Sequence, residues 1–171
     1  MVYTGRGDEG NTDLASGERV SKSSERIDAY GTVDELNSLV GLIAAEVENG
    51  KSLKEIQNEL HIIQAELADM DPDKRVEEEE VERLEQRCDH YQSDTSMPND
   101  FVLAGGSKGA AYFDLARSVA RRAERKVVAL HKKEELRQPL LSYINRLSDL
   151  FYLMARHTNH EEGVEEKNPD Y

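Results

Sequence analysis

Apolar residues recur every three or four positions along most of the chain, which is the spacing of one buried face of a helix. Isolated runs that alternate as strands do are few. The first stripe, for example, runs through Ile27, Tyr30, Val33, Leu36 and Val40. Five segments of this kind predict helices, over Glu25–Glu48, Ser52–Met70, Lys74–Ser93, the part of Phe101–Leu130 after its glycine pair, and Gln138–His160.

Turn and breaker residues separate these segments. Asn49-Gly50 supplies a turn, and Asp71-Pro72-Asp73 ends the second helix because proline disfavours helix in the residue before it. Residues 94–100 form a loop, and Pro139 occupies a favoured first-turn position. Thr32 to Glu35 has the form of a capping box, so Gly31-Thr32 indicates a break or restart in the first helix.

The segment Phe101–Leu130 organises the chain. It begins with an apolar, strand-like piece, Phe101–Leu103, breaks at Gly105-Gly106, and continues as a helix with an alanine-rich face. Four arginines follow one side of that helix, and like charges four apart cost roughly 0.2–0.5 kcal/mol per pair in an isolated helix. Either an anion meets this row or acids on neighbouring helices pair with it; the row consists of Arg117, Arg121 and Arg125, with Arg122 beside them.

A glycine-rich leader, residues 1–24, precedes the first helix and has too few apolar residues for a core element. Its glycines allow backbone N–H groups to approach an anion, and its hydroxyls and cations could complete a phosphate site. The leader contains neither a Walker A loop nor a dinucleotide motif between strand and helix. A polar, disordered N-terminus is the alternative interpretation; the residues concerned are Thr4, Gly5, Arg6, Gly7, Thr12 and Lys22.

Composition limits the classes of function. The 171 residues fit one domain, 1–171, and 35 acids against 22 Lys and Arg give a net charge of −13, which argues against a nucleic-acid binder. The single Cys88 excludes an intrachain disulfide and a CxxC site and indicates a reducing compartment. With no signal peptide or membrane-length apolar run, we expect a cytoplasmic protein that contacts no membrane. The acidic tail, 161–171, is expected to be flexible.

The residues alone predict an all-α bundle that binds a polyanion. Two classes of function remain open: a nucleotide-dependent enzyme, or an acidic interaction protein whose arginines pair with neighbouring helices. Asn145 and Asp149 are four apart and could act together, and His157 with His160 could hold a metal. A di-iron bundle is disfavoured because no Glu-x-x-His pair occurs.

Four segments in order resemble the signature blocks of ATP:cob(I)alamin adenosyltransferases of the propanediol-utilisation (PduO-like) type. They read YTGRGDEGNTDL, RIDAYGTVDELNSLVGL, FVLAGGSKGAAYFDLARSVARRAER and YINRLSDLFYLMAR. The resemblance implies a five-helix bundle that assembles as a homotrimer with an active site between subunits. It also implies transfer of the 5′-deoxyadenosyl group of ATP to the cobalt of cob(I)alamin, with release of triphosphate. Mg²⁺ would stabilise the polyphosphate leaving group. A cobalamin reductase and an adenosylcobalamin-dependent client enzyme are the implied protein partners.

The resemblance also implies roles for single residues. Phe101 would occupy the lower face of cobalamin and displace its dimethylbenzimidazole ligand, and with Arg121 and Arg125 it would form the catalytic set. Asp34 would pair with Arg117 across the subunit interface, and Glu124 would be a magnesium or water partner. The implied ATP-binding residues are Thr4, Gly5, Arg6, Gly7, Thr12, Asp13, Lys22, Arg121, Arg122, Glu124, Arg125 and Asn145.

Several positions depart from the family pattern. Thr4-Gly5-Arg6-Gly7 stands where Thr-Arg-Thr-Gly or Thr-Lys-Thr-Gly is usual, and Asp13 replaces a small residue. Ala104 replaces a common proline, and Tyr112-Phe113-Asp114 replaces a usual Leu-His pair. These departures concern the ATP contacts, and they leave a catalytically weak helical bundle that binds nucleotide or a protein as the alternative function.

Overall fold

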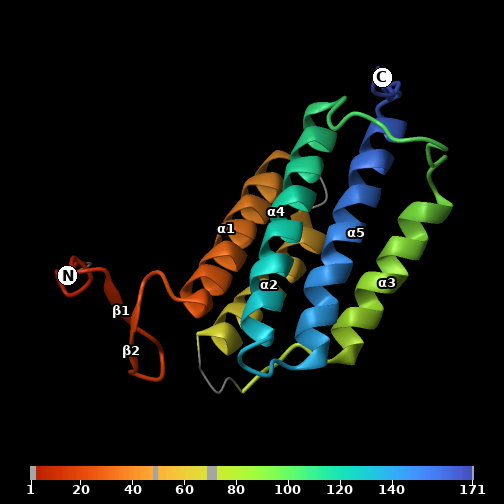
Figure 1. Ribbon diagram of the computed structural model, residues 1–171. Coiled ribbons are helices and arrows are strands. Elements are labelled where there is room, and N and C mark those ends of the chain that lie inside the picture. The colour runs from red at the N-terminus through yellow and green to blue at the C-terminus, as the bar shows by residue number, and fades with distance from the viewer. Residues whose placement is uncertain (1–2, 48–49, 69–72, 171) are drawn as a thin grey trace.

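The chain folds into five helices preceded by a small hairpin (Figure 1). The computed structural model describes residues 3–47, 50–68 and 73–170. The predicted five-helix, all-α fold is confirmed. The elements are β1 (Asn11–Asp13), β2 (Arg19–Ser21), α1 (Glu25–Glu46), α2 (Gly50–Leu67), α3 (Glu78–Ser93), α4 (Lys108–His131) and α5 (Gln138–Glu161).

Helix α4 lies between α1 and α5, while α2 packs on α1 and α3 packs on α5. Ion pairs at both ends show that α1 and α4 are antiparallel. Lys108 at the start of α4 pairs with Glu46 at the end of α1, and Lys133 just after α4 pairs with Glu25 at the start of α1. The arginine-bearing helix is therefore the centre of the bundle.

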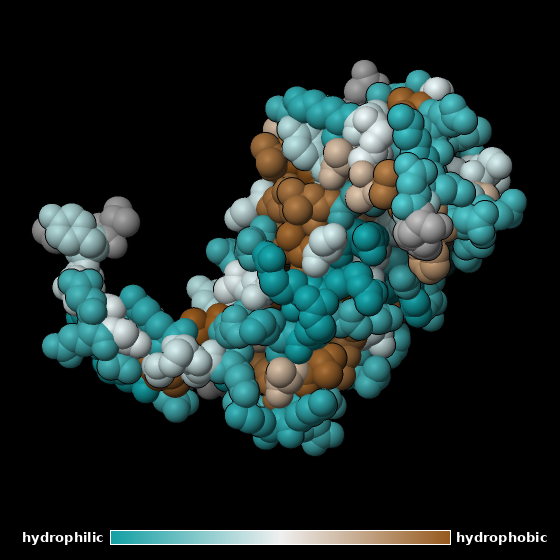
Figure 2. Space-filling view, turned by 45° about the horizontal axis from the view of Figure 1, so that its top comes forward, coloured by the Kyte–Doolittle hydropathy of each residue, from teal (hydrophilic) through white to brown (hydrophobic). Residues whose placement is uncertain are grey.

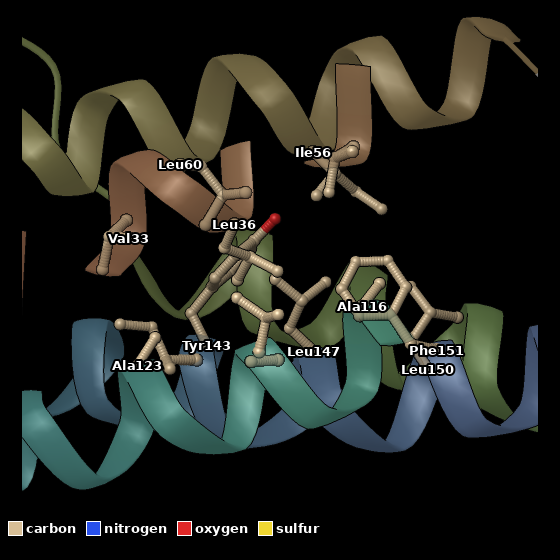
Figure 3. Packing of buried hydrophobic residues seen from close by; sticks show 14 of the residues in the cluster. Val33, Leu36, Ile56, Leu60, Ala116, Ala123, Tyr143, Leu147, Leu150 and Phe151 are labelled. Carbon is tan, nitrogen blue, oxygen red and sulfur yellow. The ribbon is translucent and has the colours of Figure 1, made fainter. Parts of the chain in front are cut away.

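The predicted apolar stripes meet in one core (Figure 3). Leu36, Leu60 and Leu147 are fully buried, and each such side chain contributes about 1.5–3 kcal/mol. Ala116 and Ala123 give α4 a narrow face that lets the neighbouring helices approach closely. The spacing read from the sequence thus identifies the buried faces correctly.

Helix α1 runs without interruption through Gly31-Thr32, so the predicted break is wrong. Ser24 caps the helix instead, because its hydroxyl accepts from the N–H of Ile27 at 3.4 Å. The Thr32 side chain is buried, and its hydroxyl donates to the carbonyl of Asp28 at 2.6 Å. A hydroxyl bonded within its own helix is not available to cap a new one.

Two other elements differ from the sequence prediction. Phe101–Leu103 forms no strand; in the described part of the chain the only strands are β1 and β2, an antiparallel pair with Thr12 opposite Val20. Helix α3 begins at Glu78 rather than at Lys74, because Glu77 and Glu80 form a capping box there. The predicted ends at Glu48 and Met70 lie outside the described residues.

The tail after α5 folds back on the bundle. The carbonyl of Lys167 accepts from the N–H of Leu103 at 2.8 Å, and Glu166 lies 3.0 Å from Arg156. Two residues of the tail, Glu166 and Lys167, thus contact the bundle, while the flexibility expected for 161–171 stays a prediction. Within the described residues, no helix combines the length and apolar character needed to cross a membrane.

Candidate active site

The arginine row lies along a cleft of about 670 Å³ between α3, α4 and α5. Arg117 and Arg121 line this cleft, and Arg125 is exposed one turn further along α4. Among the described residues, neither Arg121 nor Arg125 has an acidic partner within salt-bridge distance. Two guanidinium groups on adjacent turns are therefore free to bind an anion, which is the arrangement that polyphosphate recognition needs.

Arg122 lies on the other side of α4, where it faces α1. Its Nη2 is 2.5 Å from the carboxylate of Glu35, and both side chains are about half exposed. An exposed pair of this kind contributes roughly 0–1 kcal/mol. One interpretation of the row was that acids on neighbouring helices pair with it, and Arg122 makes such a pair. The family resemblance implies instead that Arg122 binds ATP.

Glu124 and Asn145 are brought together between α4 and α5. The side-chain amide of Asn145 donates to Glu124 at 2.7 Å, and Glu124 is one residue from Arg125. The sequence instead grouped Asn145 with Asp149, which in the structure pairs with Arg146 at 3.2 Å. A carboxylate and an amide beside free arginines offer oxygen ligands of the type that Mg²⁺ prefers.

Asp34 and Arg117 do not pair within one chain. Asp34 is exposed on α1, and it has no ion-pair partner in the described residues. The Nε of Arg117 is buried without a hydrogen-bond partner there and lies 3.9 Å from Asp114. A buried, unsatisfied donor is costly, so a further acceptor for this Nε would be favourable.

The leader forms a compact turn of charged residues. Asp13 lies 3.0 Å from both Arg6 and Arg19, and Arg19 also donates to the carbonyl of Arg6 at 2.6 Å. The amine of Lys22 lies so close to Gly7 that a Cβ there would be 3.0 Å from it. The two departures at Arg6 and Asp13 therefore pair with each other, and Arg19, to which the sequence gave no role, contacts both.

The leader and the Phe101 loop lie at opposite ends of the bundle (Figure 1). The hairpin stands off the end where α1 begins, whereas the loop from α3 to α4 crosses the end where α1 finishes. Helix α4 has 24 residues, so the two ends are roughly 36 Å apart. One chain does not bring its own leader and its own Phe101 together.

Phe101 is the most exposed large apolar residue of the described chain, at 83%. Leu103 in the same loop is 52% exposed. Figure 2 shows that further apolar side chains gather on the visible face of the body, from which the leader projects. Two exposed apolar side chains in one loop are suited to contact an apolar ligand or partner, although a single exposed ring would not by itself identify a binding site.

The described residues contain no group of three or more His, Cys, Asp and Glu that could hold a metal ion. His157, proposed with His160 as a metal pair, instead shares a hydrogen bond with Thr95 at 3.0 Å. Cys88 lines the cleft, and burial raises the pKa of its thiol to about 11. This thiol is protonated at neutral pH and offers neither a metal ligand nor a nucleophile.

A family model described as cobalamin adenosyltransferase matches residues 2–158. The chain is 42% identical to a corrinoid adenosyltransferase of Bacillus subtilis (strain 168), covering 95% of this chain and 89% of that protein. The chain belongs to the cobalamin adenosyltransferase family. It is also 42% identical to the corrinoid adenosyltransferase PduO of Salmonella typhimurium over 91% of this chain, and it spans 48% of that longer protein.

Solved structures of the family match the whole fold. A phenylalanine-to-histidine variant of the PduO-type ATP:corrinoid adenosyltransferase from Lactobacillus reuteri, complexed with cobalamin and ATP, superposes with a TM-score of 0.91. It is 34% identical, and the match covers 97% of this chain and 95% of that one. An arginine-to-lysine variant of the same enzyme, complexed with ATP, gives a TM-score of 0.89 at 35% identity. The family resemblance inferred from the four sequence blocks is confirmed.

Three residues around the site were given no role from the sequence, although Asp114 and Arg156 lie inside the family blocks. Asp114 on α4 and Arg156 and Asn159 on α5 are buried and polar. From sequence alone, a charged residue beside an apolar stripe is predicted to be exposed to solvent, because a buried partner cannot be identified. Asp114 and Arg156 are 42 positions apart, so only the folded chain shows that they pair.

Proposed function

We propose that this chain is an ATP:corrinoid adenosyltransferase that moves the 5′-deoxyadenosyl group of ATP to the cobalt of cob(I)alamin. One observation carries the proposal beyond family membership. Arg121 and Arg125, which have no acidic partners among the described residues, lie on α4, and the exposed loop that bears Phe101 leads into the start of that helix. The variants solved from the Lactobacillus reuteri enzyme, complexed with cobalamin or ATP, change these same two residue types.

The reaction makes modest demands on side-chain chemistry. Cob(I)alamin is a strong nucleophile, so its cobalt attacks C5′ directly and triphosphate leaves with the electron pair of the C5′–O bond. No protein nucleophile or general base takes part. The protein must hold C5′ in line with cobalt and stabilise the charge that gathers on the triphosphate.

The candidate residues divide that task. Arg121 and Arg125 bind the leaving triphosphate, and the backbone N–H groups of the leader with Lys22 complete its surroundings. Glu124, held by Asn145, would bind Mg²⁺ directly or through water. When bound, Mg²⁺ neutralises the charge on the phosphate oxygens.

Phe101 acts on the corrinoid. Its ring, 83% exposed, is available to lie against the lower face of cobalamin and displace dimethylbenzimidazole. Without that axial donor, the added electron enters an orbital of lower energy, so cob(II)alamin is easier to reduce. A corrin ring over Phe101 and Leu103 would also remove both side chains from water.

A complete site requires neighbouring subunits, and a homotrimer is the assembly we propose. Three features support it. The leader and Phe101 lie at opposite ends of one chain, separated by the length of α4, roughly 36 Å. Within the described residues, the Nε of Arg117 lacks a hydrogen-bond acceptor and Asp34 has no ion-pair partner. Asp34 of one subunit would supply the acceptor for Arg117 of the next. Leu42 on α1 and Leu115 on α4, about half exposed, are suited to the same interface.

An absorbance assay tests the function. The protein with ATP, Mg²⁺ and chemically reduced cob(I)alamin should convert the spectrum to that of adenosylcobalamin. An unchanged spectrum would contradict the proposal and favour the alternative, a catalytically weak bundle that binds nucleotide or a protein. A reducing cytoplasm, a cobalamin reductase and an adenosylcobalamin-dependent client enzyme fit the proposed reaction, because cob(I)alamin forms only under reducing conditions.

A further inference from the structure

A buried ion pair joins the two central helices at the end of the bundle that carries Phe101. The carboxylate of Asp114 on α4 accepts from Nη2 of Arg156 on α5 at 2.7 Å, and their side chains are only 5% and 1% exposed. The Nε of Arg156 lies 3.0 Å from Glu166 in the C-terminal tail. The pair is thus extended to a second carboxylate, which lies in the tail five residues after the end of α5.

These side chains hold the backbone of the glycine pair before α4. Asp114 accepts from the N–H of Gly105 at 2.8 Å. Asn159 donates to the carbonyl of Gly105 and to Glu166, both at 2.8 Å, and accepts from the N–H of Ser107 at 2.9 Å. Both polar groups of Gly105 are therefore bound by buried side chains from α4 and α5.

The tail makes a second contact closer to Phe101. The N–H of Leu103 donates to the carbonyl of Lys167 at 2.8 Å, two residues from Phe101 and one from Glu166. Gly106 allows this close arrangement: it has φ +98°, and a Cβ there would lie 2.5 Å from the side chain of Asn159. The tail, the glycine pair and the end of α5 are in direct contact.

The Phe101 ring has no packing of its own to fix its position, because it is 83% exposed. Its place is set by the backbone contacts of Leu103, Gly105 and Ser107. A buried ion pair is a poor source of stability but a good means of fixing geometry, and a displaced catalytic group costs rate without unfolding the protein.

We propose that Asp114, Arg156, Asn159 and Glu166 form a positioning set that holds the Phe101 loop in place for the corrinoid. The proposal rests on the role proposed above for Phe101. It assigns the C-terminal tail, through Glu166 and Lys167, a part in the removal of the lower ligand. The set touches no substrate; it acts through the loop.

Glu166→Ala is the most informative variant, since Glu166 is near the surface and both of its contacts belong to the set. Glu165→Ala is the matched control, because Glu165 is the exposed neighbour and has no ion pair in the described residues. The substrates are cob(II)alamin and cob(II)inamide, each with ATP, Mg²⁺ and a weak reductant. Cob(II)inamide lacks the dimethylbenzimidazole nucleotide, so its reduction does not require displacement of that base.

Glu166→Ala should lower the rate with cob(II)alamin about ten-fold, the effect of losing one charge-assisted contact, and leave the rate with cob(II)inamide within about two-fold. Glu165→Ala should match the wild type with both substrates. In the electron paramagnetic resonance spectrum of cob(II)alamin bound with ATP, Glu166→Ala should retain more of the splitting from the axial nitrogen. In a Phe101→Ala background, Glu166→Ala should have little further effect.

An equal loss with both substrates, no loss with either, or an additive loss in the Phe101→Ala background would overturn the positioning role. The proposed function is checked separately with wild-type protein and chemically reduced cob(I)alamin. Failure of that reaction would reject the enzyme itself. Success there with no difference between the two cob(II) substrates would reject only the positioning set.

Discussion

The position of each arginine around the axis of α4 determines whether its guanidinium group has an acidic partner. Arg117, Arg121 and Arg125 are four apart and share one side, a relation that the sequence alone predicts. Arg122 is turned toward α1, and its pairing with Glu35 could not be predicted, because it depends on how α1 and α4 pack. The sequence therefore indicates an anion-binding row but not which of its members keep their charge available.

Arg125→Ala should lower kcat/KM for ATP by roughly ten- to a hundred-fold, because a charge-assisted contact to triphosphate is worth about 1.5–3 kcal/mol. Arg122→Ala is the matched control on the same helix and should stay within about three-fold of the wild type, since it loses only an exposed ion pair. Steady-state kinetics with cob(I)alamin measure both. Equal losses in the two variants would show that Arg122 also binds ATP.

Asp13 pairs with Arg6 at 3.0 Å, so it would compete with the triphosphate that the family resemblance assigns to Arg6. Asp13→Ser should therefore lower KM for ATP by about two- to five-fold, the range of a partly exposed ion pair, with little change in kcat. Glu9→Gln removes the same charge from an exposed residue of the leader and should leave KM unchanged. A rise in KM for Asp13→Ser would mean that Asp13 instead holds Arg6 and Arg19 in a productive position.

Cys88 should react slowly with thiol reagents at pH 8, because burial raises the pKa of its thiol to about 11, with a further contribution from Asp149. The rate of labelling should rise with pH and become fast at pH 8 once the chain is unfolded in denaturant. The folded thiol keeps its proton to higher pH than the unfolded one, so this group lowers stability above the ordinary pKa. Rapid labelling of the native protein at pH 8 would contradict this assignment.

At the level of elements, the helices were predictable and their local features were not. The apolar spacing identifies all five, because each buries one stripe in the same core. The hairpin was missed because three-residue strands such as Asn11–Asp13 are too short to show alternation. The break expected at Thr32 is absent because tertiary packing buries that residue in the middle of α1.

Alanine substitutions in the glycine pair before α4 test the backbone geometry at the start of that helix. Gly105 and Gly106 both have positive φ, +118° and +98°, so alanine at either site costs about 1–3 kcal/mol in backbone strain. Gly106→Ala should cost at least about 1 kcal/mol more, because its Cβ would also meet Asn159, whereas the Cβ of Gly105→Ala meets nothing within 4 Å. Urea unfolding of the two variants measures the difference, and equal losses would mean that Asn159 moves away freely.

At the level of the whole molecule, periodicity predicted the bundle, but the proposed site came from the order of the four family blocks. Neither reveals that the leader and Phe101 lie at opposite ends of one chain, since that depends on the direction of α1 and α4. If the proposed function holds, this arrangement makes assembly part of the mechanism. A site that contains both groups must take them from different subunits.

Mixed oligomers test that requirement directly. Lys22→Ala chains lack a leader cation, and Phe101→Ala chains lack the corrinoid residue, so each alone should be weakly active with cob(II)alamin and a weak reductant. When the two are co-expressed in equal amounts, about a quarter of the interfaces combine an intact leader from one chain with an intact Phe101 from the next. Activity should then rise to about a quarter of the wild-type value. If each site were built within one chain, no site in the mixture would contain both an intact leader and an intact Phe101. A mixture no more active than either variant alone would therefore contradict an interface site.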